Sequence, residues 1–158
     1  MKKKRQLSVR VKDWILWGGF GLYALVLLYI LFLSRNPWSG FTIRDYFRNF
    51  TNFVPFRTVA DYIRSYQKGF EAVAIKNLLG NLLLFLPMGA LLPFLFSRFN
   101  RFWRVILAIL CIIVAVEVVQ MLLRIGSIDI DDVILNLCGG MAGYPISKLP
   151  ILRRIFCD

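Results

Sequence analysis

The sequence predicts an all-α membrane protein with four transmembrane helices and an aromatic, basic interfacial segment between the first two. Two observations favour this fold class. Of the 158 residues, 58% are hydrophobic and only 18% are charged, which is more apolar side chain than a soluble domain of this length buries. The apolar residues also gather in runs near 20 residues long, the length at which a helix crosses a bilayer.

The first predicted span runs from about residue 14 to residue 33, after a basic N-terminus at residues 1–13. A cleaved signal peptide is the alternative, because it also joins a basic start to an apolar run. This run is longer than the apolar core of such peptides, and the letters "LFLSRNPW" supply no small-residue cleavage site. We therefore expect an uncleaved membrane anchor.

The connection at residues 35–76 is expected to be an outer loop with structure of its own. Aromatic residues alternate in it with Lys and Arg. Thr58 and Asp61 have the spacing of a capping box, and Gly69 is expected to end the helix that they begin. Such a helix lies either in the headgroup layer or as a lid packed over the spans. Both alternatives place aromatic surface near the outer leaflet.

The remaining spans are expected at residues 77–96, 103–123 and 132–146. The second span contains Pro87 and Pro93, which predict a kink or a break in the helix. The fourth span is shorter and rich in small residues, which let helix backbones approach closely. These small residues are Gly139, Gly140, Ala142 and Gly143. We expect the fourth span to pack inside the bundle.

The charges of the short connections predict that both termini are cytoplasmic. Lys and Arg mark the cytoplasmic side of a membrane protein. They occupy the connection between the second and third spans and the basic tail at residues 149–158, whereas the connection before the fourth span is acidic. The basic outer loop disagrees, although a long loop translocates largely regardless of its charge. The predicted transmembrane domain covers residues 14–148.

Composition also removes several classes of function. The chain has no His, so it has neither a Ser-His-Asp triad nor an imidazole metal site. Its three Cys form no CxxC pair, which argues against a zinc site or a disulfide framework. The net charge of +11 comes from residues that flank the apolar runs, as expected beside anionic lipid headgroups. We expect no cofactor, no metal and no nucleic-acid partner.

Polar residues from three predicted spans fall at a similar depth near the outer surface. In the third span, Glu117, Gln120 and Arg124 share one helix face. The other members are Asn77 and Asn81 in the second span, and Asp129, Asp132 and Asn136 at the start of the fourth. One interpretation is a structural clamp, in which Asn81 and Asn136 satisfy Glu117 and Gln120. The other is a polar pocket open to the outer leaflet.

Four stretches of the sequence are distinctive: "TNFVPFRTV" (51–59), "NLLGNLLLFLPMGALLP" (77–93), "EVVQ" (117–120) and "GSIDIDDVILNLCGGMAGY" (126–144). Together they resemble the VanZ-like family of small bacterial membrane proteins. The resemblance implies a multi-pass protein of the bacterial cytoplasmic membrane. It also implies a link to reduced susceptibility to teicoplanin, a glycopeptide antibiotic with a fatty acyl tail.

The same resemblance maps the recurrent polar positions of the family onto this chain. They correspond to Asn52, Asn77, Asn81, Glu117, Gln120, Asp129, Asp132 and Asn136. An Arg that often precedes the acidic loop of the family corresponds most closely to Arg124, whose role stays open.

Three functions are compatible with the sequence. The first is a non-enzymatic protein that binds or excludes membrane lipids, lipid-linked envelope precursors or lipoglycopeptides, with Asn52 and Arg57 as outer-loop contacts. The second is a hydrolase or transferase for a lipid headgroup or polyprenyl carrier, in which Glu117 is the general base and Asp129 and Asp132 hold a divalent cation. The third is a proton-coupled flippase, for which four spans would require a homo-oligomer.

Overall fold

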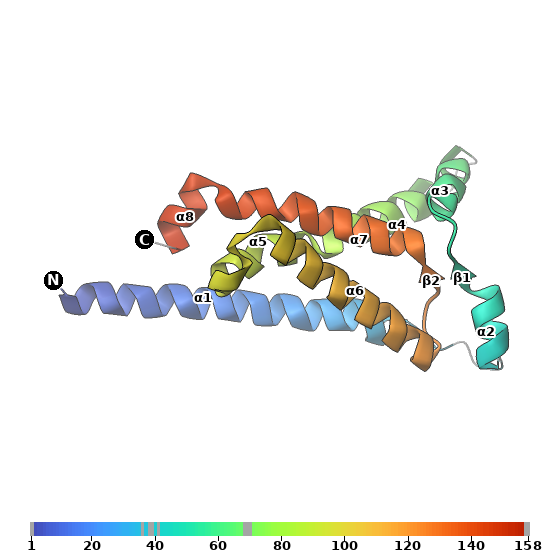
Figure 1. The fold of residues 1–158 in the computed structure, drawn as a ribbon, viewed down its shortest axis with the longest axis horizontal. Coiled ribbons are helices and arrows are strands. Elements are labelled where there is room, and N and C mark those ends of the chain that lie inside the picture. The colour runs from blue at the N-terminus through green and yellow to red at the C-terminus, as the bar shows by residue number, and fades with distance from the viewer. Residues whose placement is uncertain (1, 36, 38–39, 41, 68–70, 157–158) are drawn as a thin grey trace.

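The computed structural model describes residues 2–35, 37, 40, 42–67 and 71–156, and nearly all of its regular structure is helical. Its elements, in chain order, are α1 (Lys2–Leu28), η1 (Tyr29–Leu33), α2 (Ile43–Asn49), β1 (Thr51–Asn52), α3 (Arg57–Gln67), α4 (Glu71–Leu84), α5 (Leu86–Leu95), η2 (Ser97–Asn100), α6 (Phe102–Leu123), β2 (Ile128–Asp129), α7 (Ile130–Gly143), η3 (Tyr144–Lys148) and α8 (Pro150–Phe156). Figure 1 shows α2 and α3 at one end of the long helices, and α8 beside the first half of α1 at the other end.

Three segments of the described chain are long and apolar enough to cross a membrane: Val11–Leu33, Ile75–Leu95 and Phe102–Leu123. They match the first three predicted spans to within a few residues. The fourth predicted span corresponds to α7, which has 14 residues and is continued by the short η3. A helix of that length is shorter than the roughly 20 residues that cross a bilayer. The structure therefore supports three spanning helices, with α7 packed against them.

The second span is broken into α4 and α5 at Phe85. Pro87 explains the break, because it has no N–H to donate and its ring clashes with the carbonyl of the residue four positions earlier. Pro93, by contrast, lies inside α5 without ending it. The predicted break is thus confirmed at the first proline. The broken turn places the Phe85 ring in the core, where its side chain is 1% exposed.

The hydrophobic core lies where α1, α5 and α6 meet. Its buried members are Leu27, Leu31, Phe85, Met88, Leu92, Val105, Ile109 and Ile113. Many other large apolar side chains of the long helices, such as Trp103 and Leu122, are exposed. An apolar exterior around a small core is expected when lipid, rather than water, surrounds the helices.

Glycines let α7 approach the second span at backbone contact distance. A Cβ atom added at Gly139 would lie 1.9 Å from the carbonyl oxygen of Leu82, and one at Gly143 would lie 2.0 Å from that of Leu86. No real Cβ contact is this short, so each position requires glycine. The predicted close packing of the fourth segment is confirmed, and it holds α7 against both α4 and α5.

This packing predicts the effect of one added methyl group. We expect Gly139→Ala to lower the free energy of unfolding by about 1–3 kcal/mol, the usual cost of overpacking, because the Leu82 carbonyl must move away. Gly19→Ala is the matched control, since no heavy atom lies within 4 Å of its Cβ position, and alanine favours a helix over glycine. Thermal unfolding in one detergent compares the two. Equal stability of both variants would contradict the proposed backbone contact.

Candidate functional site

A short parallel strand pair joins the outer segment to the start of α7. Thr51 of β1 pairs with Ile128 of β2, and Asn52 pairs with Asp129. The backbone N–H of Ile128 also donates to the carbonyl of Phe50 at 2.9 Å. The pairing brings together residues that are far apart in the sequence, and it places the polar side chains of both segments at one end of the molecule.

Asp129 uses both carboxylate oxygens to hold this junction. Its Oδ1 accepts from Asn52 Nδ2 at 3.1 Å and from the backbone N–H of Asp131 at 2.9 Å. Its Oδ2 accepts from the hydroxyl of Thr58. The side chain is buried. Three donors therefore satisfy the Asp129 carboxylate, and these hydrogen bonds join β1, α3 and α7.

Asp131 caps the N-terminus of α3 from a distance. Its two oxygens accept from the backbone N–H groups of Phe56 and Val59, and its side chain is 1% exposed. A negative charge at this position satisfies amides that have no partner within the helix and complements the helix dipole. The predicted capping box is therefore wrong, because α3 begins at Arg57 and the Thr58 hydroxyl binds Asp129 instead. The predicted end at Gly69 lies outside the described residues.

Asp132, the next acid along α7, lines a cavity. It accepts a hydrogen bond from the side-chain amide of Asn81 on α4. Both line a cavity of about 760 Å³ between η1 and the residues that follow it, helices α3 and α4, and the start of α7. Asn77 lies on the same wall, one helical turn before Asn81. The predicted proximity of these residues from the second and fourth segments is thus seen in the structure.

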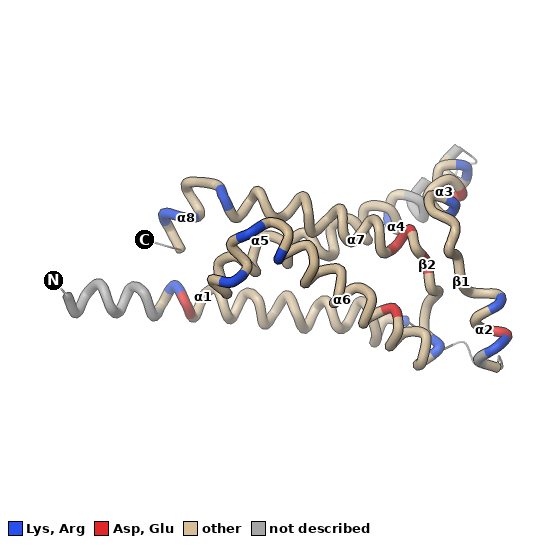
Figure 2. Tube along the Cα trace, in the orientation of Figure 1, with Lys and Arg blue, Asp and Glu red and all other residues tan. Residues whose placement is uncertain are grey.

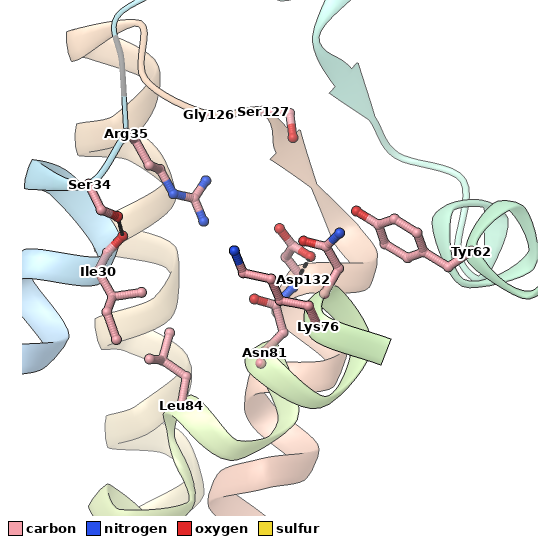
Figure 3. Close-up of a pocket in the computed structure, with 12 residues that line it drawn as sticks. Ile30, Ser34, Arg35, Tyr62, Lys76, Asn81, Leu84, Gly126, Ser127 and Asp132 are labelled. Atoms are coloured by element: carbon pink, nitrogen blue, oxygen red, sulfur yellow. Dashed lines mark hydrogen bonds between the residues drawn. The ribbon is translucent and has the colours of Figure 1, made fainter. Parts of the chain in front are cut away.

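Two cations, a tyrosine and two serines, Ser34 and Ser127, also line the cavity. Figure 3 shows the side chains of Arg35, from the end of the first span, and Lys76, on α4, reaching into the cavity that Asp132 also lines. Burial raises the pKa of the Tyr62 hydroxyl, and the negative charges of Asp132 and Asp129 raise it further. Tyr62 therefore stays protonated and presents an O–H donor. Ile30 and Leu84 supply an apolar part of the wall.

Sequence reasoning missed Arg35 as a site residue. The guanidinium reaches across to the loop before β2, where a Cβ atom on Gly126 would lie 2.3 Å from Arg35 Nη1. The family Arg had been mapped to Arg124, which instead takes a left-handed conformation (φ 56°) that ends α6. Arg124 is not among the residues that line the cavity. The one signal in the sequence was the position of Arg35 just after an apolar span.

The polar residues of α6 do not form the predicted clamp. Gln120 is buried and donates to the carbonyl of Leu31 at 2.8 Å, an oxygen near the C-terminal end of η1, where helix carbonyls lack partners within the helix. Asn81 binds Asp132 rather than Glu117. Within the described part of the chain, Glu117 Oε2 and Asn136 Oδ1 are buried without a hydrogen-bond partner.

Two further hollows flank the junction. Glu117 lines a mostly apolar groove of about 260 Å³, together with side chains such as Phe53 and Val118. Arg57 and Asn52 line a polar hollow of about 330 Å³ on the outer segment. The predicted site residues therefore do not share one pocket: some line these separate hollows, and Gln120, Arg124 and Asn136 line none of the three. Over the described chain, no group of three or more Cys, Asp or Glu side chains is placed to hold a metal ion.

Comparison with known proteins agrees with this arrangement. The family model described as VanZ/LLP1 matches residues 20–153, a range that includes each side chain of the cavity and the junction. The chain belongs to the VanZ/LLP1 family. It is 25% identical over 132 residues to Protein VanZ of Enterococcus faecium, a match that covers 84% of this chain and 73% of the relative. No solved structure matches.

The remote cap on α3 leads to a prediction for this VanZ/LLP1 protein. Asp131→Ala removes both acceptors, so we expect the attachment of α3 to weaken by roughly 3 kcal/mol, as two hydrogen bonds to a charged group are lost. Hydrogen–deuterium exchange of the α3 amides in detergent should then become faster.

Asp61→Ala is the matched control on the same helix. Asp61 is exposed and pairs with Arg64 at 3.1 Å, an interaction worth under about 1 kcal/mol at a surface. We expect the α3 amides of the Asp61→Ala variant to exchange nearly as slowly as those of the wild type. If Asp131→Ala left the exchange of α3 unchanged, the remote cap would be ruled out.

Proposed function

We propose that this VanZ/LLP1 protein is an integral membrane protein that binds or excludes lipid-anchored amphiphiles at the outer leaflet, and thereby lowers susceptibility to lipoglycopeptides such as teicoplanin. The observation that supports it most is the cavity between the span ends. Its rim contains charged side chains, and Ile30 and Leu84 add apolar wall below them. An amphiphile has the same two-part chemistry, a polar head joined to an apolar chain.

The proposal includes four membrane-embedded helices, with α7 as the fourth. α7 is short, but η3 continues it, and its glycines hold it at backbone contact distance from α4 and α5. Figure 2 shows Lys and Arg in the turn between α5 and α6 and in α8, at the end of the molecule away from α2 and α3. Positive charge in short connections favours the cytoplasm. The cavity would then open at the outer leaflet, with both termini inside.

The proposal also places α2 and α3 at the membrane interface. Phe47, Phe53 and Phe56 are each about half exposed or more, and so are Ile63 and Tyr66. Aromatic and aliphatic side chains on short helices with basic neighbours are typical of segments that lie among lipid headgroups. This surface adjoins the cavity through Tyr62. An amphiphile in the outer leaflet would meet it before reaching the cavity.

Binding is proposed in preference to hydrolysis because of how the acids are used. The hydrolase hypothesis needs Asp129 and Asp132 to hold one cation together. Asp129 instead has both oxygens committed to hydrogen bonds within the protein, and Asp132 faces the cavity from another side of the junction. Lipid headgroups and lipid-linked envelope precursors remain the expected partners.

Drug susceptibility tests the proposed function. Expression of the wild-type protein in a susceptible bacterium should raise the inhibitory concentration of teicoplanin several-fold, and raise that of a glycopeptide without an acyl tail much less. Asp132→Asn should lose most of this effect at equal protein level in the membrane, because the cavity loses its carboxylate. Asp61→Asn, on exposed surface outside the cavity, should keep it. Equal shifts for the two drugs would refute the role of the lipid anchor.

Cysteine labelling tests the orientation, on which the outer-leaflet position depends. With the native cysteines replaced, Ser127→Cys at the cavity end should react with an impermeant thiol reagent on intact cells. Ser97→Cys, in the turn between α5 and α6, should react only after permeabilisation, because the basic residues there favour the cytoplasm. Both serines are exposed. The reverse pattern would place the cavity at the inner leaflet and remove its access to external drugs.

A further inference from the structure

The charges of the cavity do not balance. Its lining contains three ionisable groups that are charged at neutral pH, Arg35, Lys76 and Asp132. Within the lining, two cations face one carboxylate, while the buried Asp129 and Asp131 belong to the junction behind it. Among the described residues, none forms a salt bridge within 4.0 Å with either cation. Two cations without a salt-bridge partner on one cavity favour the approach of an anionic ligand.

The positions of the two cations indicate where this anion comes from. Arg35 lies two residues after the first spanning segment, Val11–Leu33, and Lys76 is the second residue of the next, Ile75–Leu95. Both therefore sit at the depth where an apolar span meets the headgroup layer. Phosphate groups of membrane lipids lie at that depth. Arg and Lys are the side chains that bind phosphate oxygens, Arg through two parallel hydrogen bonds and Lys as a point charge.

The wall opposite the two cations suits a hydroxyl group of a lipid headgroup. Asp132 accepts from Asn81 at Oδ1, which leaves acceptor capacity on the carboxylate for a hydroxyl donor. The cavity of about 760 Å³ is large enough for a headgroup of a few carbon atoms. Acyl chains would extend along the apolar wall near Ile30 and Leu84, which lie on two different spans.

We infer that this cavity binds the phosphate diester of an anionic lipid with a hydroxylated headgroup, held between Arg35 and Lys76 and hydrogen-bonded to Asp132. This inference rests on the proposed function, because it assigns the same cavity to a class of amphiphile. The ligand is then a lipid phosphate, and its contacts are Arg35 and Lys76, which the hypotheses drawn from the sequence do not use. Free phosphate has the same oxyanion chemistry and lacks only the chains.

Lipid retention tests the inference. The full chain, purified in a neutral detergent, is incubated with equal amounts of phosphatidylglycerol and phosphatidylcholine, and the lipid that remains after gel filtration is measured by mass spectrometry. The wild type should retain phosphatidylglycerol in clear excess. Lys76→Gln and Arg35→Gln should each reduce that excess about tenfold, as expected when a charge-assisted hydrogen bond is lost. Equal retention of the two lipids by the wild type would overturn the inference.

The control variants distinguish three effects on lipid retention: loss of a cation in the cavity, loss of a cation elsewhere on the protein, and unfolding. Arg64→Gln removes a cation from the same end of the molecule, but outside the cavity, and should retain phosphatidylglycerol as the wild type does. Arg35→Lys keeps the charge and should retain more lipid than Arg35→Gln. If Arg35→Gln unfolds in detergent, Lys76→Gln decides the question, because Lys76 is exposed. A fall with Arg64→Gln as large as with Lys76→Gln would also overturn the inference.

One further measurement distinguishes lipid phosphate from free phosphate. A comparison of lipid retention with drug susceptibility distinguishes this inference from the proposed function. Displacement of phosphatidylglycerol by inorganic phosphate at a few times the protein concentration would show a site for free phosphate and overturn the lipid assignment. A wild type that lowers teicoplanin susceptibility without selective lipid retention overturns this inference alone. A wild type that retains phosphatidylglycerol selectively but leaves susceptibility unchanged overturns the proposed function alone.

Discussion

The backbone contact between α7 and the broken second span determines the position of most other groups in this protein. Glycine at positions 139 and 143 lets α7 lie against the carbonyls of Leu82 and Leu86. The same contact brings the first turn of α7 beside Asn81. Because Asp129 and Asp131 stand at the start of the same helix, the outer segment is also positioned by hydrogen bonds to α7. Apolar packing in the middle of the molecule thus sets the geometry of its polar end.

Three acids close together in the sequence have three different tasks. Asp129 joins β1 and α3 to α7, Asp131 caps α3, and Asp132 lines the cavity. The change from strand to helix between residues 129 and 130 turns successive side chains in different directions. Two of the acids therefore hold the outer segment, and the third lines the cavity. An acidic run in a membrane protein is not evidence of a metal site until these directions are known.

The sequence predicted well those features that depend on local physical chemistry. Run length located three spans, Pro87 predicted the break between α4 and α5, and the glycines predicted the packing of α7. Features that depend on how distant segments align with one another could not be predicted from the sequence. Gln120 binds a carbonyl of η1, whose position follows from the path of α1. Arg35 is one of many basic residues beside a span, and nothing local marks it as a residue that lines the cavity.

The junction between β1 and β2 has a consequence for the biogenesis of this protein. Asn52 and Asp129 are 77 positions apart, so the outer segment leaves the ribosome long before its partners do. Until α7 has been made and inserted, the N–H groups of Phe56 and Val59 lack their acceptor and must bind water. The hydrogen bonds that join β1 and α3 to α7 can therefore form only after α7 has been made. A chain that stops before Asp131 would keep the three long apolar segments but would lack the carboxylate that caps α3.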